Sequence, residues 1–186
     1  MNEAIDQSNG LSGPEFFKFA LDYLDITYTV IGEENLPKDG QYIFVGNHPL
    51  GGAEALMVGE IIRRNYGNNV RFIVNSLISE LKPLSGIFTP VNLLGGAQNR
   101  ELGVAVEELF NSDSQVCIFP AGTCAKKEKG EITEMPWKKM FVGRAKKFQR
   151  TVIPFHCTGR NSNWFYFISF CTYNRIIYTF LQTSFI

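Results

Sequence analysis

The residues best suited to chemistry are a histidine and a carboxylate six positions apart. His48 and Glu54 lie in the segment NHPLGGAE, residues 47–54, directly after the apolar run YIFV. Imidazole exchanges a proton near neutral pH, and a carboxylate can orient the ring and stabilise its charged form, so the pair suffices for general-base catalysis. The chain has only two histidines. The alternative is structural: His48 lies at the surface or caps a tight turn between a strand and a helix.

A second candidate is the turn IFPAGT, residues 118–123, at the end of another apolar run. Such a turn can expose backbone N–H groups near Gly122 and Thr123 to a developing oxyanion or a phosphate. Lys126 and Lys127 follow closely and could add positive charge. The other interpretation is an ordinary turn followed by a solvated basic loop, since Pro-Gly turns after strands are common.

A third segment, VIPF at residues 152–155, is followed by the second histidine, His156. Proline lacks the N–H that a central strand needs, so this strand is predicted at a sheet edge or at a bend. We expect His156 to be structural rather than catalytic.

Other catalytic signatures are absent from the sequence. It contains no phosphate-binding loop, serine-nucleophile elbow, dinucleotide fingerprint or zinc-protease helix. Two histidines and scattered thiols give no metal-ligand spacing, so no metal is expected. The basic residues cluster in one helix and the loop before it, which argues against nucleic-acid binding.

Short apolar runs alternate with amphipathic stretches along the chain. The predicted strands are Thr27–Ile31, Tyr42–Val45, Val70–Val74, Thr89–Asn92, Val116–Phe119 and Val152–Phe155. The predicted helices are Glu15–Leu24, Ala53–Asn65, Leu77–Leu81, Gln98–Phe110 and Trp137–Gln149. This alternation predicts an α/β fold with a mostly parallel central sheet flanked by helices. Ligand sites in such folds gather in the loops after the carboxyl ends of the strands, where the candidate segments lie.

The helix predicted at residues 137–149 is both amphipathic and basic. Its apolar stripe consists of Trp137, Met140, Phe141, Ala145 and Phe148. The charged residues beside it are all basic: Lys138, Lys139, Arg144, Lys146, Lys147 and Arg150. The pattern fits a core-packed helix with a solvated outer face, a surface for anionic lipid, or both. The aromatic segment 161–186 is interpreted as an interfacial hydrophobic tail or as an early end of the core.

Composition fits one folded domain of 186 residues, 45% hydrophobic and 19% charged. The formal net charge is zero, but residues 1–60 carry ten acidic and two basic side chains, whereas residues 126–150 carry nine basic and three acidic. The four cysteines lack paired spacing and the start lacks a signal peptide, so we expect reduced thiols in a cytoplasmic protein. No apolar run reaches the roughly 18 residues of a membrane-spanning helix.

Taken in order, NHPLGG plus an acid, KPLSGIFTPVN, IFPAGT and VIPF resemble the motif blocks of the PlsC-like lysophospholipid and glycerolipid acyltransferases. The similarity points to the hemolysin-like bacterial branch, which includes enzymes that add the second acyl chain to ornithine or glycine lipids. It divides the chain into an N-terminal helical segment at 1–24, an acyltransferase core at 25–160 and the tail at 161–186.

The resemblance implies a glycerol-phosphate-acyltransferase-like fold and roles for the matched residues. His48 would be the general base and Glu54 the carboxylate that orients it, while Gly122 and Thr123 would belong to the acceptor or oxyanion loop. The other substrate-binding residues would be Asn47, Gly51, Gly52, Asn92, Lys126 and Lys127. No metal or cofactor would be needed. The partners would be an acyl carrier protein or coenzyme A thioester, a lysolipid acceptor and an anionic membrane surface.

Several positions depart from the family pattern. Five residues rather than four separate the histidine from its acid, which is Glu54 in place of aspartate. Ala121 and Cys124 stand where phosphate-acceptor members carry glutamate and arginine, and Asn92 lies near the place of a second arginine. The lost charges favour an acceptor with another head group, unless the charge is supplied by Lys126, Lys127 or Arg160.

The resulting hypothesis is an O-acyltransferase of membrane lipid synthesis, peripheral on the inner face of the cell membrane. The basic helix and the aromatic tail would hold it there through anionic lipid. Two other classes remain open. Cys124 could be the nucleophile of a thioesterase, because a basic loop can lower the pKa of a thiol. The chain could instead be a non-catalytic lipid-binding protein.

Overall fold

The computed structural model describes residues 7–8, 10–75, 82–91, 100–128, 130–163 and 165. The helices in these ranges are α2 (Glu15–Tyr23), α3 (Gly52–Tyr66), α4 (Arg100–Asn111), α5 (Met140–Phe148) and the 3-10 helices η1 (Glu33–Asn35) and η2 (Lys82–Ile87). The strands are β1 (Tyr42–Gly46), β2 (Val70–Asn75), β3 (Phe88–Val91), β4 (Gln115–Ile118), β5 (Lys126–Glu128), β6 (Glu131–Thr133) and β7 (Thr151–Phe155).

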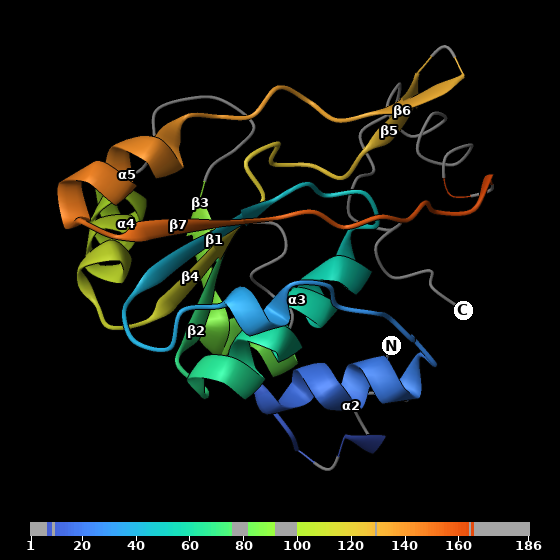
Figure 1. The fold of residues 1–186 in the computed structure, drawn as a ribbon, viewed down its shortest axis with the longest axis horizontal. Coiled ribbons are helices and arrows are strands. Elements are labelled where there is room, and N and C mark those ends of the chain that lie inside the picture. The colour runs from blue at the N-terminus through green and yellow to red at the C-terminus, as the bar shows by residue number, and fades with distance from the viewer. Residues whose placement is uncertain are drawn as a thin grey trace.

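Five strands form a parallel sheet in the order β3-β2-β4-β1-β7, and β5 and β6 form a separate antiparallel hairpin (Figure 1). β1 is buried along its whole length, with β4 on one side and β7 on the other. A strand covered on both faces needs an apolar side chain at every position, which explains the continuous run YIFV. The predicted α/β fold with a mostly parallel sheet is confirmed.

Alternate residues of β1 face two hydrophobic cores. Tyr42 and Phe44 pack in a cluster with side chains of α2 and α3, whereas Ile43 and Val45 pack in a cluster with side chains of α4 and α5. This is the two-residue period of a strand. Helices therefore cover both faces of the sheet, α2 and α3 on one and α4 and α5 on the other (Figure 1).

The parallel arrangement brings the carboxyl ends of the strands to one edge of the sheet. The segments after β1, β4 and β7 meet there, although the contact between Asn47 and Cys157 spans 110 residues of sequence. Ligand sites of open α/β sheets form at this edge. The fold thus gathers the three candidate segments without any of them being adjacent in the chain.

Five of the predicted strands are present, each with bounds within one residue of those expected, and the proline-containing β7 is an edge strand as predicted. The strand predicted at Thr27–Ile31 is wrong, because no strand is assigned to these residues. Asp25 has a left-handed backbone (φ 51°) after α2, and the segment then follows the surface, where Ile31 is 94% exposed. A β-rich sequence forms a strand only where a partner strand and a buried face are available.

The helices predicted around residues 15–24, 53–65 and 98–110 are confirmed as α2, α3 and α4. The helix predicted at Leu77–Leu81 lies outside the described residues, as does most of the segment 161–186. Within the described ranges, no helix combines the length and the apolar character needed to cross a membrane.

The basic helix begins at Met140 rather than Trp137 and packs against the core. Its residues Met140, Phe141, Ala145 and Phe148 contact the cluster beneath the sheet. Arg144 and Lys147 form ion pairs with Glu107 of α4. Arg150 is not part of the basic outer face, because it is buried and donates to the backbone carbonyls of Phe110, Ser112 and Ser114. The core-packed interpretation of this helix is therefore correct.

Arg150→Met should destabilise the fold markedly. The substitution keeps much of the side-chain volume but leaves carbonyls at the end of α4 without donors in a buried place, at a cost of about 3 kcal/mol in the free energy of unfolding. Urea denaturation measures this value. Lys139→Met, a change at an exposed lysine, is the matched control and should stay within about 0.5 kcal/mol of the unsubstituted protein. Equal stability of the two variants would contradict the assigned role of Arg150.

Candidate active site

The site is centred on the turn between β1 and α3, which holds His48 against Glu54. Nδ1 of His48 lies 2.7 Å from Oε1 of Glu54, and the carboxylate is fully buried. The same Oε1 accepts the backbone N–H groups of Leu50 and Gly51 at 2.9 Å each. Glu54 stands at the third position of α3, where the unpaired N–H groups of a helix N-terminus favour negative charge. The predicted pairing of histidine and acid is thus geometrically present.

The additional residue between histidine and acid is accommodated by the turn. Gly51 has a left-handed backbone (φ +85°), which a residue with a side chain rarely adopts, and α3 begins immediately after it at Gly52. The tight turn folds the helix start back toward β1, and the longer side chain of Glu54 covers the remaining distance to the ring. Glutamate with five intervening residues therefore brings a carboxylate to the histidine, although the family pattern has aspartate with four.

Some polar atoms of His48 and Glu54 are left without a hydrogen-bond partner among the described residues. Nδ1 and Oε1 lie at ion-pair distance, but their angle does not meet that of a hydrogen bond, and Oε2 of Glu54 is buried without a partner among the described residues. Catalytic hydrogen bonds are often poorly aligned before substrate binds and tighten afterwards. With Nδ1 directed to the carboxylate, Nε2 is the nitrogen left to exchange a proton with a substrate.

Aromatic packing fixes the plane of the imidazole. The His48 ring stacks on Phe119 with ring centroids 4.2 Å apart and planes 19° apart, and Phe119 in turn meets Phe155 edge-on. Phe155 lies directly over Gly46, where an added Cβ would fall 2.1 Å from its ring. The ring is therefore held from one side by Gly46 at the end of β1, Phe119 just after β4 and Phe155 at the end of β7. This reduces the rotational freedom that the ring would have on an open turn.

The backbone of His48 is held from a second direction. Its N–H donates to the carboxylate of Glu134, and its carbonyl accepts the N–H of Ala125 at 2.8 Å. The other oxygen of Glu134 accepts Nε1–H of Trp137 at 3.1 Å. Glu134 lies 86 residues from His48, in a segment with no motif, so nothing in the sequence pointed to this residue.

The segment after β7 closes on the same turn. The side-chain amide of Asn47 both donates to the carbonyl of Cys157 at 2.8 Å and accepts its N–H at 2.7 Å. Buried Asn161 donates to the carbonyl of Pro49 at 3.2 Å. Asn47 was predicted to bind substrate, but in this structure its amide holds the turn to the chain. Asn161 had no signal in the sequence.

The loop after β4 contributes differently from the sequence expectation. The N–H of Gly122 donates to the carbonyl of Phe119 at 2.9 Å, so the turn itself uses this donor. The hydroxyl of Thr123 is buried without a partner among the described residues, so this loop holds a polar side chain that is available to a substrate. Sγ of Cys124 lies against Gly51, 3.3 Å from where a Cβ would stand, so the loop and the turn are in contact.

Three of the remaining predicted site residues belong to α3 and β5. Gly52 is the exposed first residue of α3, Lys126 and Lys127 lie on β5, and Asn92 falls outside the described residues. The described part of the chain holds no group of three His, Cys, Asp or Glu side chains placed for a metal ion.

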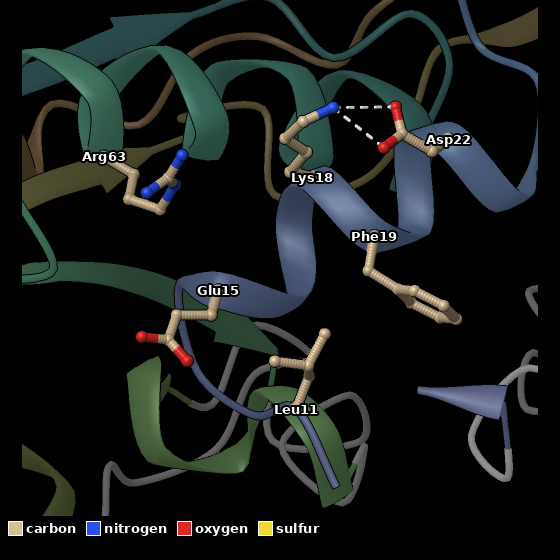
Figure 2. Close-up of a pocket in the computed structure, with 6 residues that line it drawn as sticks. All are labelled: Leu11, Glu15, Lys18, Phe19, Asp22 and Arg63. Atoms are coloured by element: carbon tan, nitrogen blue, oxygen red, sulfur yellow. Dashed lines mark hydrogen bonds and ion pairs between the residues drawn. The ribbon is translucent and has the colours of Figure 1, made fainter. Parts of the chain in front are cut away.

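A cavity of about 340 Å³ lies elsewhere, beside α2 and α3 (Figure 2). Its lining residues are Leu11, Glu15, Lys18, Phe19, Asp22 and Arg63. None of them belongs to the loops at the carboxyl edge of the sheet, and Lys18 and Asp22 form an ion pair at 2.8 Å. The cavity is therefore separate from the His48 turn.

The chain is an α/β protein with a histidine–carboxylate pair at the carboxyl edge of a parallel sheet. The acyltransferase family model matches residues 4–178. The crystal structure of PlsC, the 1-acyl-sn-glycerophosphate (LPA) acyltransferase from Thermotoga maritima, matches with a TM-score of 0.52 and 25% identity, over 76% of this chain and 54% of that one. The chain belongs to the acyltransferase family, and the resemblance to PlsC is confirmed.

Two curated relatives are lyso-glycine lipid O-acyltransferases. The proteins from Phocaeicola vulgatus and Bacteroides thetaiotaomicron are 39% and 38% identical to this chain over 166 residues. These alignments cover 89% of the chain but only 59% and 61% of the relatives, so the chain spans less than two thirds of their length.

Glu54→Asp should lower turnover strongly without unfolding the protein. The shorter side chain withdraws the carboxylate from Nδ1 by more than 1 Å, and a displacement of this size costs about 10²-fold in rate. The measurement is kcat for acyl transfer, with circular dichroism as a check of folding. Glu60→Asp is the matched control, because Glu60 is also a buried acid of α3 but pairs with Arg63. Full turnover in Glu54→Asp would remove the carboxylate from the mechanism.

Glu134→Ala should release the backbone of His48. Protein labelled with ¹⁵N-histidine gives only two backbone amide signals, from His48 and His156. Loss of a hydrogen bond to a charged group, about 1.5 kcal/mol or more, should speed hydrogen exchange of the His48 amide by about tenfold and move its proton signal upfield. The His156 signal, and both signals in the control Glu131→Ala, should stay in place. An unchanged His48 signal in Glu134→Ala would exclude the contact.

Proposed function

We propose that this protein transfers a fatty acyl group from a thioester carrier to the hydroxyl of a lysolipid, with lyso-glycine lipid as the acceptor. The observation that carries the proposal is the buried Glu54 carboxylate 2.7 Å from Nδ1 of His48, at the carboxyl edge of a PlsC-like sheet. The two curated relatives, which are named for this reaction, support the choice of acceptor.

The reaction needs one base and no covalent enzyme intermediate. Nε2 of His48 removes the proton from the acceptor hydroxyl as its oxygen attacks the thioester carbonyl. The tetrahedral intermediate then collapses, the carbon–sulfur bond breaks, and the leaving thiolate takes the proton back from the imidazolium. The products are an ester and a free thiol. A positioned base contributes about 10²–10⁴-fold, and Glu54 stabilises the imidazolium that forms in between.

In this proposal the loop after β4 supplies a hydrogen-bond donor to the developing charge. Because the N–H of Gly122 is engaged within its turn, the buried hydroxyl of Thr123 is the better candidate donor. One such donor contributes about 10²–10³-fold when it is directed at the oxyanion. Thr123 therefore takes the oxyanion role that the sequence assigned to the backbone around Gly122.

The residues of the same loop favour an acceptor without a phosphate. Ala121 is buried and Cys124 lies against Gly51, so neither position offers a charge to a phosphate group. The acyl donor in this proposal is a thioester of either acyl carrier protein or coenzyme A. The proposed place of action is the inner face of the cell membrane, where the acceptor lipid is accessible.

The state of the Cys124 thiol argues against the thioesterase alternative, in which Cys124 would be the nucleophile. Burial, and secondarily the negative charge of Glu54, raise the pKa of the Cys124 thiol to about 11. A thiol with this pKa is almost wholly protonated near pH 7, whereas the nucleophile of a thioesterase must be a thiolate. The neighbouring basic residues do not reverse the effect. No contact among the residues that the structure describes favours a non-catalytic lipid-binding protein over the acyltransferase.

His48→Ala should lower the rate of acyl transfer by about 10²-fold or more, because the base is lost. The assay offers radiolabelled acyl carrier protein and coenzyme A thioesters with lyso-glycine lipid or lysophosphatidic acid. His156→Ala is the matched control, since His156 is exposed and should leave turnover unchanged. Transfer by His48→Ala at the unsubstituted rate would refute the mechanism. Transfer to lysophosphatidic acid alone would keep the mechanism and refute the acceptor.

A further inference from the structure

Asn161 lies in the segment that follows β7, and this segment contacts the turn after β1 at several points. The side chain of Asn47 exchanges two hydrogen bonds with the backbone of Cys157. A Cβ added to Gly159 would lie 3.1 Å from Cδ1 of Leu50, so the chain passes close to that side chain. Asn161 itself is only 7% exposed, and a buried amide needs hydrogen-bond partners. It finds them in the backbone of the turn.

The side chain of Asn161 donates to two consecutive carbonyls of this turn. Its Nδ2 lies 3.2 Å from the carbonyl oxygen of Pro49 and 3.4 Å from that of Leu50. An amide nitrogen carries two hydrogens, so one side chain can serve both acceptors. None of the described peptide bonds is cis, and in a trans peptide the N–H points away from the C=O of the same unit. The N–H groups of Leu50 and Gly51, which belong to these two units, therefore point away from Asn161.

Both of these N–H groups donate to the same atom, Oε1 of Glu54, at 2.9 Å each. Two peptide units are thus held between two side chains, with Asn161 on their carbonyl side and Glu54 on their N–H side. Successive backbone N–H groups that converge on one oxygen form a small anion-binding nest. Hydrogen bonds in such a chain strengthen one another, because a peptide unit whose carbonyl accepts a hydrogen bond becomes a better donor at its N–H.

Gly51 makes this orientation of the turn easy to lose. Glycine adopts positive and negative φ with similar ease, and Gly51 has φ +85°, so the peptide unit before it can rotate at little cost. A rotation would direct the carbonyl of Leu50, instead of the N–H of Gly51, at the buried carboxylate of Glu54. An ionised carboxylate only accepts hydrogen bonds, so it gains nothing from a second acceptor. Asn161 opposes the rotation, because its amide holds that carbonyl on the other side.

We propose that Asn161 is a positioning residue of the general-base site, which acts on His48 through the backbone of the turn and the carboxylate of Glu54. Asn161 holds two peptide units in the orientation that binds Oε1, and Oε1 is the atom that lies 2.7 Å from Nδ1 of His48. A shift of the carboxylate moves the group that orients the imidazole, and a placement error near one ångström costs about 10²-fold in rate. The proposal rests on the proposed function, in which His48 is the base.

NMR on the protein without substrate tests the contact itself. Leucine precedes glycine at three places in the sequence, residues 50–51, 94–95 and 102–103. Protein labelled with ¹³C-carbonyl leucine and ¹⁵N-glycine therefore gives three HNCO signals, one of which reports on both ends of the Leu50–Gly51 peptide. Asn161→Leu keeps the approximate size of the side chain without its donors, and it should move the carbonyl carbon and the amide proton of this signal upfield. The signal of the 102–103 peptide in α4 should stay in place.

Acyl-transfer kinetics test the effect on the base. Asn161→Leu should lower kcat about tenfold or more and leave KM within about twofold, because it displaces the carboxylate and not a substrate contact. Asn163→Leu is the matched control and should keep the turnover of the unsubstituted protein, because Asn163 is exposed and its side-chain oxygen accepts from Arg160. When Glu54→Asp is already present, Asn161→Leu should lower kcat by no more than about twofold, since residues that act through one another are not additive.

Circular dichroism checks that each variant is folded, and Asn161→Ala replaces Asn161→Leu in both tests if the leucine variant is not. An unchanged Leu50–Gly51 signal would overturn the proposal, as would an equal loss of kcat with and without Glu54→Asp. Full kcat in Asn161→Leu, together with lost transfer in His48→Ala, would also overturn it and leave the proposed function intact. A shifted signal in a protein that transfers no acyl group would refute the proposed function and support the role of Asn161 in holding Glu54.

Discussion

The buried carboxylate of Glu54 is the interaction on which the candidate site depends. A charge without solvent is costly unless the protein supplies hydrogen bonds and an opposite charge. Here the start of α3 provides a favourable field, two backbone N–H groups of the turn donate to Oε1, and His48 lies at 2.7 Å. The contacts that make this buried anion tolerable thus also fix the shape of the turn and direct Nδ1 of the histidine.

The turn after β1 is held by the segments that follow its two neighbouring strands, β4 and β7. Phe119, the residue after β4, stacks on the imidazole, the loop beyond it binds the carbonyl of His48, and the segment after β7 binds the side chain of Asn47. General-base catalysis depends on placement, since errors of an ångström cost orders of magnitude in rate. A parallel sheet suits this requirement, because rigid strands end side by side while their loops vary.

The two sides of the molecule differ in charge, and the difference relates to the site. The acid-rich first 60 residues include α2 and most of α3, whereas the basic residues between 126 and 150 follow the loop that touches His48. Some of these cations are structural, as Arg150 shows by binding three carbonyls at the end of α4. Those that remain exposed, Lys139 and Lys146 among them, are the ones available to a partner.

The sequence alone determined the α/β class, five strands, the main helices and the histidine–carboxylate pair. These features come from local patterns: apolar runs for buried strands, helical periodicity, and the glycines that let a short turn bring Glu54 to His48. Only the tertiary structure decided which distant residues support the site. Glu134 and Asn161 reach the turn through contacts over 86 and 112 positions, and no local pattern encodes such a pairing. The two wrong predictions have the same cause. The local sequence predicts a strand at residues 27–31 and an exposed position for Arg150, but the contacts with residues distant in the sequence decide otherwise.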